Sequence, residues 1–223
     1  MATPLINQRD SQGRQQGYWE ETDEYGFIWK GHYVDDLRQG LWKKYYKDGT
    51  LGSEGHYKND MRQGLWKIYY DDGTLEEEGH YLDDERQGLW KKYHEDGTLE
   101  SEGNYLNGEK HGLWKWYRED GTLEEEGNYH KGERQGLWKE YHEDGTLERE
   151  GHYLNGQKHG PRKWYYPDGV TLEQEGHLLN GELHGLWKVY HRDGTPKKCT
   201  LYNMGEELFS SPLLILLHWF DLI

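Results

Sequence analysis

Carboxylate and imidazole side chains recur in phase along the chain, and together they could coordinate a divalent metal ion. The glutamates are Glu54, Glu78, Glu102, Glu126, Glu150 and Glu175, and the histidines two positions later are His56, His80, His152 and His177. Zinc accepts both ligand types. However, Asn104 and Asn128 interrupt the histidines, and no two histidines have the spacing of a short-range ligand pair. We therefore expect a solvated polar face and no metal site.

Lysines recur with the same period. They are Lys43, Lys67, Lys91, Lys115, Lys139, Lys163 and Lys188. Acidic residues outnumber lysine and arginine by 42 to 27, which disfavours a basic substrate-binding stripe. We expect the lysines to pair with the glutamates across neighbouring strands, each exposed pair contributing about 0.2–1 kcal/mol.

Motifs of known enzymes are absent or lack their context. The triplet His191-Arg192-Asp193 imitates a protein kinase catalytic loop, but no Asp-Phe-Gly follows it. The recurrent Asp-Gly-Thr-Leu-Glu resembles part of a calcium loop without the alternating oxygen ligands or flanking helices. There is no Walker loop, dinucleotide fingerprint, nucleophile elbow or zinc knuckle. We predict no catalytic residue, no cofactor and no enzymatic activity.

All these side chains belong to a sequence repeat of about 24 residues, which determines the structural elements that carry them. Its marker is the triplet Gly-Leu-Trp, at residues 40–42, 64–66, 88–90, 112–114, 136–138 and 185–187. Self-similarity at such a period is the signature of a repeat array. With a shorter first copy starting at Gly17, eight copies end near Gly205. Two places depart from the pattern: Gly160-Pro161-Arg162 replaces the triplet, and Val170 is inserted.

Each copy has the pattern of a β-hairpin. Aromatic-rich segments lie between Asn-Gly or Asp-Gly pairs, which are strand and turn signals, and helical spacing of apolar residues is absent from 17 to 205. We predict an all-β fold: an elongated single-layer antiparallel meander of repeated hairpins. The predicted parts are a polar N-terminal segment (1–16), eight repeats (17–205) and an apolar C-terminal cap or docking segment (206–223).

Two turn types compete at Asp-Gly: a two-residue type I′ loop, and a three-residue loop ending in a left-handed glycine. Pro167, before Asp168-Gly169, favours the three-residue loop, because proline pre-sets the first central φ of a type I turn.

That loop predicts Tyr45 opposite Leu51 and Leu41 opposite Gly55, with Leu41 on the packed face and Trp42 on the other, variable face. A two-residue loop would slip the pairing by one and put Trp42 over Gly55.

Composition narrows the classes of partner. The chain has 223 residues, a net charge of −15 and only 33% hydrophobic residues, so its 11 Trp and 19 Tyr must supply the burial. An acidic surface repels nucleic acid and anionic membranes. The single cysteine, Cys199, suits a reducing compartment. The N-terminus lacks the apolar stretch of a secretory signal, and no run reaches the length of a membrane span. We expect a cytoplasmic protein.

The C-terminal segment differs in character from the repeats. Ser211 and Pro212 mark a helix start, and the residues that follow, including Trp219 and Phe220, are apolar nearly all round. About twelve helical residues span about 18 Å, too short to cross a bilayer. Three roles stay open: a cap on the last hairpin, docking to a partner or a second copy, and shallow apolar insertion into a membrane.

One copy shows the resemblance to a known family. The pattern Gly103-x-Tyr105-x-Asn107-Gly108-x-x-x-Gly112, followed by strand aromatics and Asp120-Gly121, resembles the MORN repeat in its variant form. The resemblance covers about residues 17–205. It implies successive β-hairpins in an elongated sheet, and roles in scaffolding, partner binding or membrane association. Some similar bacterial proteins are labelled antitoxin components.

From these observations we predict a non-enzymatic scaffold that binds another protein along an aromatic-rich β-ribbon. Exposed rings would be the anchors, because aromatic residues are enriched at interface hot spots. The candidates are Trp42, Trp66, Trp90, Trp114, Trp138, Trp187, Trp219 and Phe220. Alternatively, the tryptophans pack on one another and bind nothing. Two other functions remain: a peripheral membrane tether through the C-terminal segment, and an antitoxin-like neutralising protein.

Overall fold

The computed structural model describes residues 6–211, and every regular element in that range is a β-strand. Two compact units divide the chain: residues 1–111 with 119–121, and residues 112–118 with 122–223. The first holds β1 (Gln8–Arg9), β2 (Gln15–Thr22), β3 (Ile28–Val34), β4 (Leu37–Tyr45), β5 (Leu51–Lys58), β6 (Met61–Tyr69), β7 (Leu75–Leu82), β8 (Glu85–Tyr93) and β9 (Leu99–Leu106).

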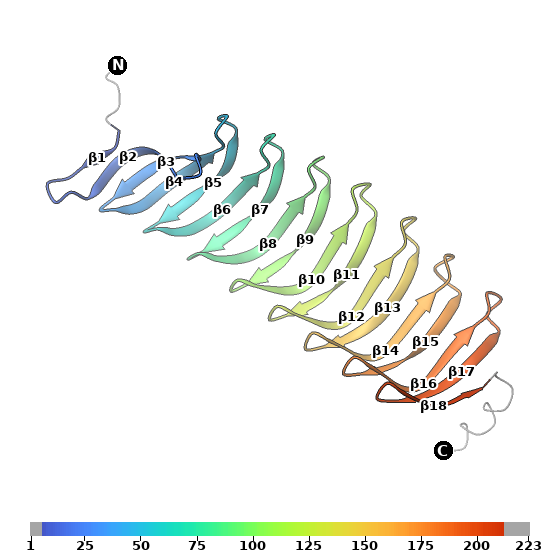
Figure 1. Cartoon of the computed structure of the whole chain (residues 1–223). Coiled ribbons are helices and arrows are strands. Elements are labelled where there is room, and N and C mark those ends of the chain that lie inside the picture. Colours follow the sequence, from blue (N-terminus) through green and yellow to red (C-terminus); the bar gives the residue numbers. More distant parts are fainter. Residues whose placement is uncertain (1–5, 212–223) are drawn as a thin grey trace. The chain divides into compact units, whose positions relative to one another are not determined.

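The second unit takes most of β10 (Glu109–Tyr117) and the strands that follow it. These are β11 (Leu123–His130), β12 (Glu133–Tyr141), β13 (Leu147–Leu154), β14 (Gln157–Tyr165), β15 (Leu172–Leu179), β16 (Glu182–Tyr190), β17 (Pro196–Asn203) and β18 (Glu206–Ser211). Within each unit, each strand pairs antiparallel with the next one in sequence (Figure 1). The predicted all-β meander of hairpins is therefore confirmed.

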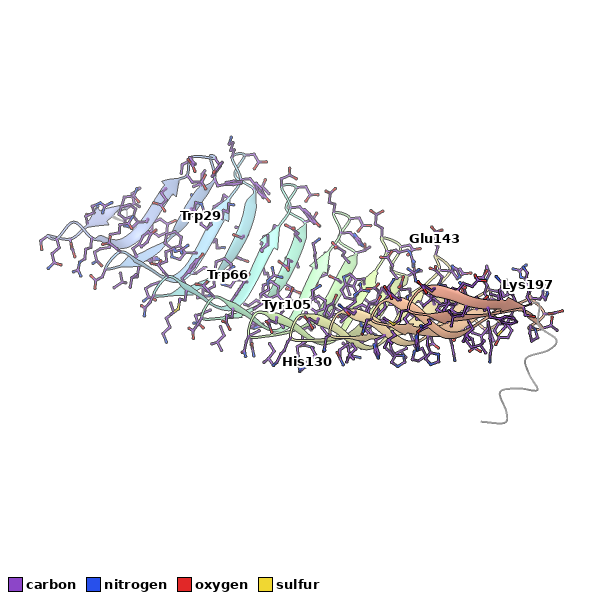
Figure 2. All side chains as sticks on the ribbon, turned by 60° about the horizontal axis from the view of Figure 1, so that its bottom comes forward. Trp29, Trp66, Tyr105, His130, Glu143 and Lys197 are labelled. Atoms are coloured by element: carbon purple, nitrogen blue, oxygen red, sulfur yellow. The ribbon has the colours of Figure 1, made fainter. Side chains whose placement is uncertain are left out.

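The Asp-Gly hairpins join the strands at one end of each strand. The three-residue loop predicted for them is present. Around Asp48, Tyr46 N–H donates to Thr50 O at 2.8 Å and Gly49 N–H donates to Tyr46 O at 2.9 Å, with Gly49 at φ 92°. The Asp48 carboxylate accepts from Thr50 N–H at 2.9 Å, and this bond holds the pKa of Asp48 below its ordinary value. In the second unit, Glu143 lies at this end of the strands and His130 at the other end (Figure 2).

The turns at the other end of the strands are tighter. Asn59 and Asp60 both have positive φ, at 52° and 68°, as a two-residue type I′ hairpin requires. Asp60 also accepts from Arg38 N–H and Nε–H, both at 2.9 Å, so this turn is tied to the preceding repeat, as the turn at Asp84 is through Arg62.

The predicted register is wrong beyond its first pair. Tyr45 does lie opposite Leu51, but a β-bulge follows, so Lys44 pairs with Ser53, Lys43 with Glu54 and Trp42 with Gly55. The extra residue, Gly52, restores the slipped pairing that a two-residue loop would have produced. In this register Trp42 lies opposite Gly55, and the missing Cβ atom of Gly55 leaves room for the indole of the next strand, Trp66.

A second irregularity lies on the strand that carries the Gly-Leu-Trp triplet in each regular repeat. Gly55 pairs with Trp66, but the next residue, His56, pairs with Gln63, which leaves Gly64 and Leu65 as the extra residues. Gly64 has φ 66°, a left-handed conformation that glycine adopts at little cost. The glycine of the Gly-Leu-Trp triplet is thus part of a bulge, and this bulge sets which face of the sheet the following leucine and tryptophan occupy.

The sheet extends beyond both ends of the predicted array of repeats. In the segment predicted as a polar tail, β1 pairs with β2, which begins at Gln15. In the segment predicted as a cap, β18 pairs with β17. The helix predicted from Pro212 onward, with Trp219 and Phe220, lies outside the described residues.

Candidate interaction surfaces

The tryptophans of the triplets form a buried row on one side of the sheet, which we call the tryptophan face. Trp42 is only 1% exposed, and a Cβ atom on Gly31 of the neighbouring strand would lie 2.2 Å from its ring. Its Nε1–H donates to the carbonyl of His32 at 3.1 Å. The same bond recurs from Trp66, Trp90, Trp138 and Trp187.

Tyrosines alternate with these indoles. In the first unit, Tyr57 packs edge-on between Trp42 and Trp66, with ring centroids 6.2 and 5.0 Å away. The alternation continues through Tyr81 and Trp90 to Tyr105. Each edge-to-face pair contributes about 0.5–1.5 kcal/mol beyond area burial. This alternating row is the core of the unit.

Arginines cover the row. Arg38 and Arg62 stack over Tyr57 and Tyr81, each with its guanidinium carbon 3.9 Å from the ring centroid. Two other arginines lie over indoles and also meet a carboxylate: Arg86 over Trp90 with Glu77, and Arg134 over Trp138 with Glu125. Burial raises the pKa of Glu77 although Arg86 opposes the shift.

The prediction that the repeat tryptophans are exposed anchors is wrong. Trp42, Trp66, Trp90, Trp114, Trp138 and Trp187 are all buried. The bulges turn each indole onto a glycine of the neighbouring strand, where tyrosines and arginines enclose it. The alternative, that the rings pack along the sheet, describes the structure, with tyrosines placed between the indoles.

The other side of the sheet, the leucine face, carries the exposed apolar row. In the first unit Leu41, Leu65 and Leu89 are 42%, 43% and 48% exposed, and in the second unit Leu113 and Leu137 are also exposed. The prediction that Leu41 lies on the packed face is therefore wrong. The recurrent strand glycine, Gly55, was the signal for the correct assignment, because only the slipped register puts Trp42 opposite it.

Polar side chains between these leucines bind one another, as the sequence predicted. Lys43 Nζ lies 3.0 Å from Glu54 Oε2, and Tyr69 O–H donates to Glu54 Oε1 at 3.1 Å. Burial, with the glutamate beside it, raises the pKa of Tyr69 to about 12, while Lys43 lowers that of Glu54. Lysine–glutamate contacts recur at Lys67–Glu78, Lys115–Glu126, Lys163–Glu150 and Lys188–Glu175.

Two hollows interrupt the surfaces. One of about 300 Å³ lies in the first unit among side chains of the tryptophan face, including Trp29, Lys44, Tyr46 and Ile68. The other, of about 240 Å³, lies in the second unit on the leucine face, where Pro161 replaces the leucine of the triplet. Lys163, Glu175, His177 and Lys188 contribute to its lining.

The remaining motifs have structural roles. Asp193, of the kinase-like triplet, accepts from Thr195 N–H at 2.8 Å in a hairpin turn. Among residues 6–211, no three histidine, cysteine, aspartate or glutamate side chains gather as a metal site would require. No helix in this range could span a membrane.

Comparison with known proteins agrees with this repeat geometry. The family model described as MORN repeat variant matches seven segments: residues 38–59, 62–83, 86–107, 110–131, 134–155, 158–178 and 183–204. Each segment begins at the second residue of a strand and includes the following Asp-Gly hairpin; six of them end in the next turn, and 158–178 ends within β15. No curated protein matches the chain.

Proposed function

The chain belongs to the MORN repeat variant family, and on this basis we propose that it is a non-enzymatic scaffold whose leucine face binds another protein. The observation that carries the proposal is the exposed leucine row. Leu41, Leu65 and Leu89 each lie two strands from the next, which corresponds to about 9.6 Å between neighbours. A regular apolar row offers a partner repeated contacts that single scattered leucines cannot.

The chemistry around the leucines favours a protein partner over a lipid surface. Leu41 lies opposite His56, and the Lys43–Glu54 pair follows on the same face. Inserting the leucines into hydrocarbon would also strip water from these charged groups, which is costly. A protein surface can match apolar side chains with leucines and polar groups with the intervening pairs. We propose a partner with that alternation.

The polar groups of the leucine face support a binding role rather than a catalytic one. Glu54 receives bonds from both Lys43 and Tyr69, so its carboxylate is already occupied. The same glutamate–tyrosine bond recurs at Glu78–Tyr93, Glu126–Tyr141, Glu150–Tyr165 and Glu175–Tyr190. A general base or nucleophile would need an activated, accessible group instead.

The test uses three versions of the whole chain to capture a partner from an extract of the native source. One is wild type, one carries Leu41→Ser, Leu65→Ser and Leu89→Ser, and the control carries Lys44→Ser and Ile68→Ser on the tryptophan face. We expect wild type and control to capture the same protein, and the leucine variant to lose it. The purified partner should then bind the leucine variant at least about tenfold more weakly, a loss of about 1.4 kcal/mol.

Leu41, Leu65 and Leu89 are exposed, so the leucine variant should melt close to wild type, whereas the control, at the half-buried Lys44 and Ile68, should melt at or below it and still be folded. The proposal is wrong if the leucine variant, folded, binds the purified partner as tightly as wild type does. It is equally wrong if wild type captures nothing that the leucine variant does not.

A further inference from the structure

Arg162 interrupts the tryptophan row of the second unit. It occupies the place of the indole in the altered triplet Gly160-Pro161-Arg162, on β14 between β13 and β15 (Figure 1). Its stem lies against Gly151, as the indoles lie against their glycines: a Cβ atom there would be 2.6 Å from Arg162 Cγ. A charged side chain thus occupies a site built for a ring.

Two of the three guanidinium nitrogens of Arg162 are buried without a hydrogen-bond partner. Arg162 is 4% exposed, and neither Nε nor Nη1 has a partner. Its nearest ring contacts are Tyr153 and Trp164, whose centroids lie 5.9 and 5.3 Å from the guanidinium carbon. Such cation–π contacts attract the charge but satisfy none of its N–H donors.

None of the carboxylates of residues 6–211 forms an ion pair with Arg162, and several of those on nearby strands bind other side chains. Glu140 pairs with Arg149, which stands on β13 where β7 and β11 have glutamates. Glu150 and Glu175 lie on the leucine face, where they bind lysines and tyrosines.

The neighbouring repeats show how an arginine on this face is normally satisfied. Arg86 donates from Nη1 and Nη2 to the two oxygens of Glu77, at 2.7 and 2.8 Å, while it stacks over Trp90. Arg134 donates from Nη2 to Glu125 Oε1 at 2.6 Å, while it stacks over Trp138. At both places an arginine beside aromatic rings receives a carboxylate from the preceding strand.

We propose that Arg162 is a binding site for a carboxylate that comes from outside the sheet, on an acidic side chain or chain end of a partner protein. A buried, unpaired charge destabilises the fold, and an incoming carboxylate would relieve that cost. Nη2, which is not among the buried unpaired atoms, is the nitrogen that an incoming carboxylate would meet first, and a charge-assisted bond there would be strong. A chain with net charge −15 repels a singly charged carboxylate less than a doubly charged phosphate. The site is on the opposite face from the leucine row and does not depend on it.

The test follows the Arg162 Nε–H resonance of the full chain, labelled with nitrogen-15 and assigned by its loss in Arg162→Lys. The titrants, at constant ionic strength, are acetate, a capped Gly-Glu-Gly peptide and the matching Gly-Gln-Gly peptide. We expect the resonance to shift saturably with the glutamate peptide and to stay unmoved with the glutamine peptide. Acetate that saturates equally well would identify small carboxylates as ligands, and a response to the peptide alone would favour a partner side chain.

Thermal unfolding supplies an independent readout. At a hundredfold excess over its dissociation constant, the glutamate peptide should raise the melting temperature of wild type by about 5 °C. Arg162→Gln should lose that rise and, since it removes the buried charge, melt above wild type when no peptide is present. The control Arg134→Gln removes an arginine that already has a carboxylate, and it should keep the rise. An unmoved Arg162 resonance, or an equal rise in Arg162→Gln, would overturn the proposal.

Discussion

Glycine at position 55 and its counterparts determine which side chains are buried. Gly55, Gly79 and Gly127 each leave room for the indole of the following strand, and a Cβ atom at any of them would lie within 2.2 Å of that ring. Because the indole lies flat on the backbone, the adjacent leucine must point to the other face. A single missing methyl group in each repeat thus places both rows.

Gly55→Ala tests this packing directly. Its Cβ would clash with Trp66 at 2.2 Å, so we expect a loss of about 1–3 kcal/mol in the free energy of unfolding, measured by urea denaturation. The matched control is Gly52→Ala. Its Cβ would lie 3.1 Å from the Tyr46 ring, which can rotate slightly, so the change should be small. Equal stability of the two variants would mean that Trp66 does not lie over residue 55.

At the scale of the strand, the leucine face is held by tyrosine–glutamate bonds between repeats. Tyr69, Tyr93 and Tyr165 donate to Glu54, Glu78 and Glu150 at 3.1, 3.1 and 2.9 Å. Burial, together with the neighbouring carboxylate, raises the pKa of each phenol from 10.0 to about 12. The folded state therefore holds these protons more tightly than the unfolded state does.

This shift predicts alkaline unfolding. The stabilisation is complete below pH 10.0, the ordinary pKa of tyrosine, and is lost as pH rises from there through about 12. Phenolate absorbance should rise in two steps, the later one coinciding with loss of the β-sheet circular dichroism signal. Glu54→Gln removes one carboxylate and should bring the titration of Tyr69 to lower pH. A single phenolate step near pH 10 in the folded protein would contradict these bonds.

The hairpins and the cross-strand ion pairs could be predicted from the sequence because their signals are local. Pro167 and the Asp-Gly pairs indicate the turn, and Lys43 and Glu54 recur in phase. The register was not predicted, because the bulges at Gly52 and at Gly64-Leu65 change the pairing without a residue pattern specific to a bulge, and only the strand glycine Gly55 pointed to it. Arg162 was visible as a break in the repeat, but its lack of a partner depends on where Glu140, Glu150 and Glu175 point.

At the scale of the whole molecule, repetition of one 24-residue pattern gives each unit one closed face and one face with exposed apolar side chains. In each unit the tryptophan face is closed by its own tyrosines and arginines, and the leucine face leaves apolar side chains open to solvent. Substitutions of the exposed leucines should therefore alter the proposed binding with little effect on folding, and those in the tryptophan row should do the reverse. Arg162 is the exception, where the tryptophan face itself has an unmet bonding requirement.

Photo-crosslinking from single positions tests the division between the two faces most directly. A benzophenone amino acid replaces Leu65 on the leucine face or Ile68 on the tryptophan face, three residues away on the same strand. With the captured partner present, we predict a crosslink from position 65 and none from position 68. A crosslink from position 68 alone would contradict the assignment of the leucine face as the binding surface.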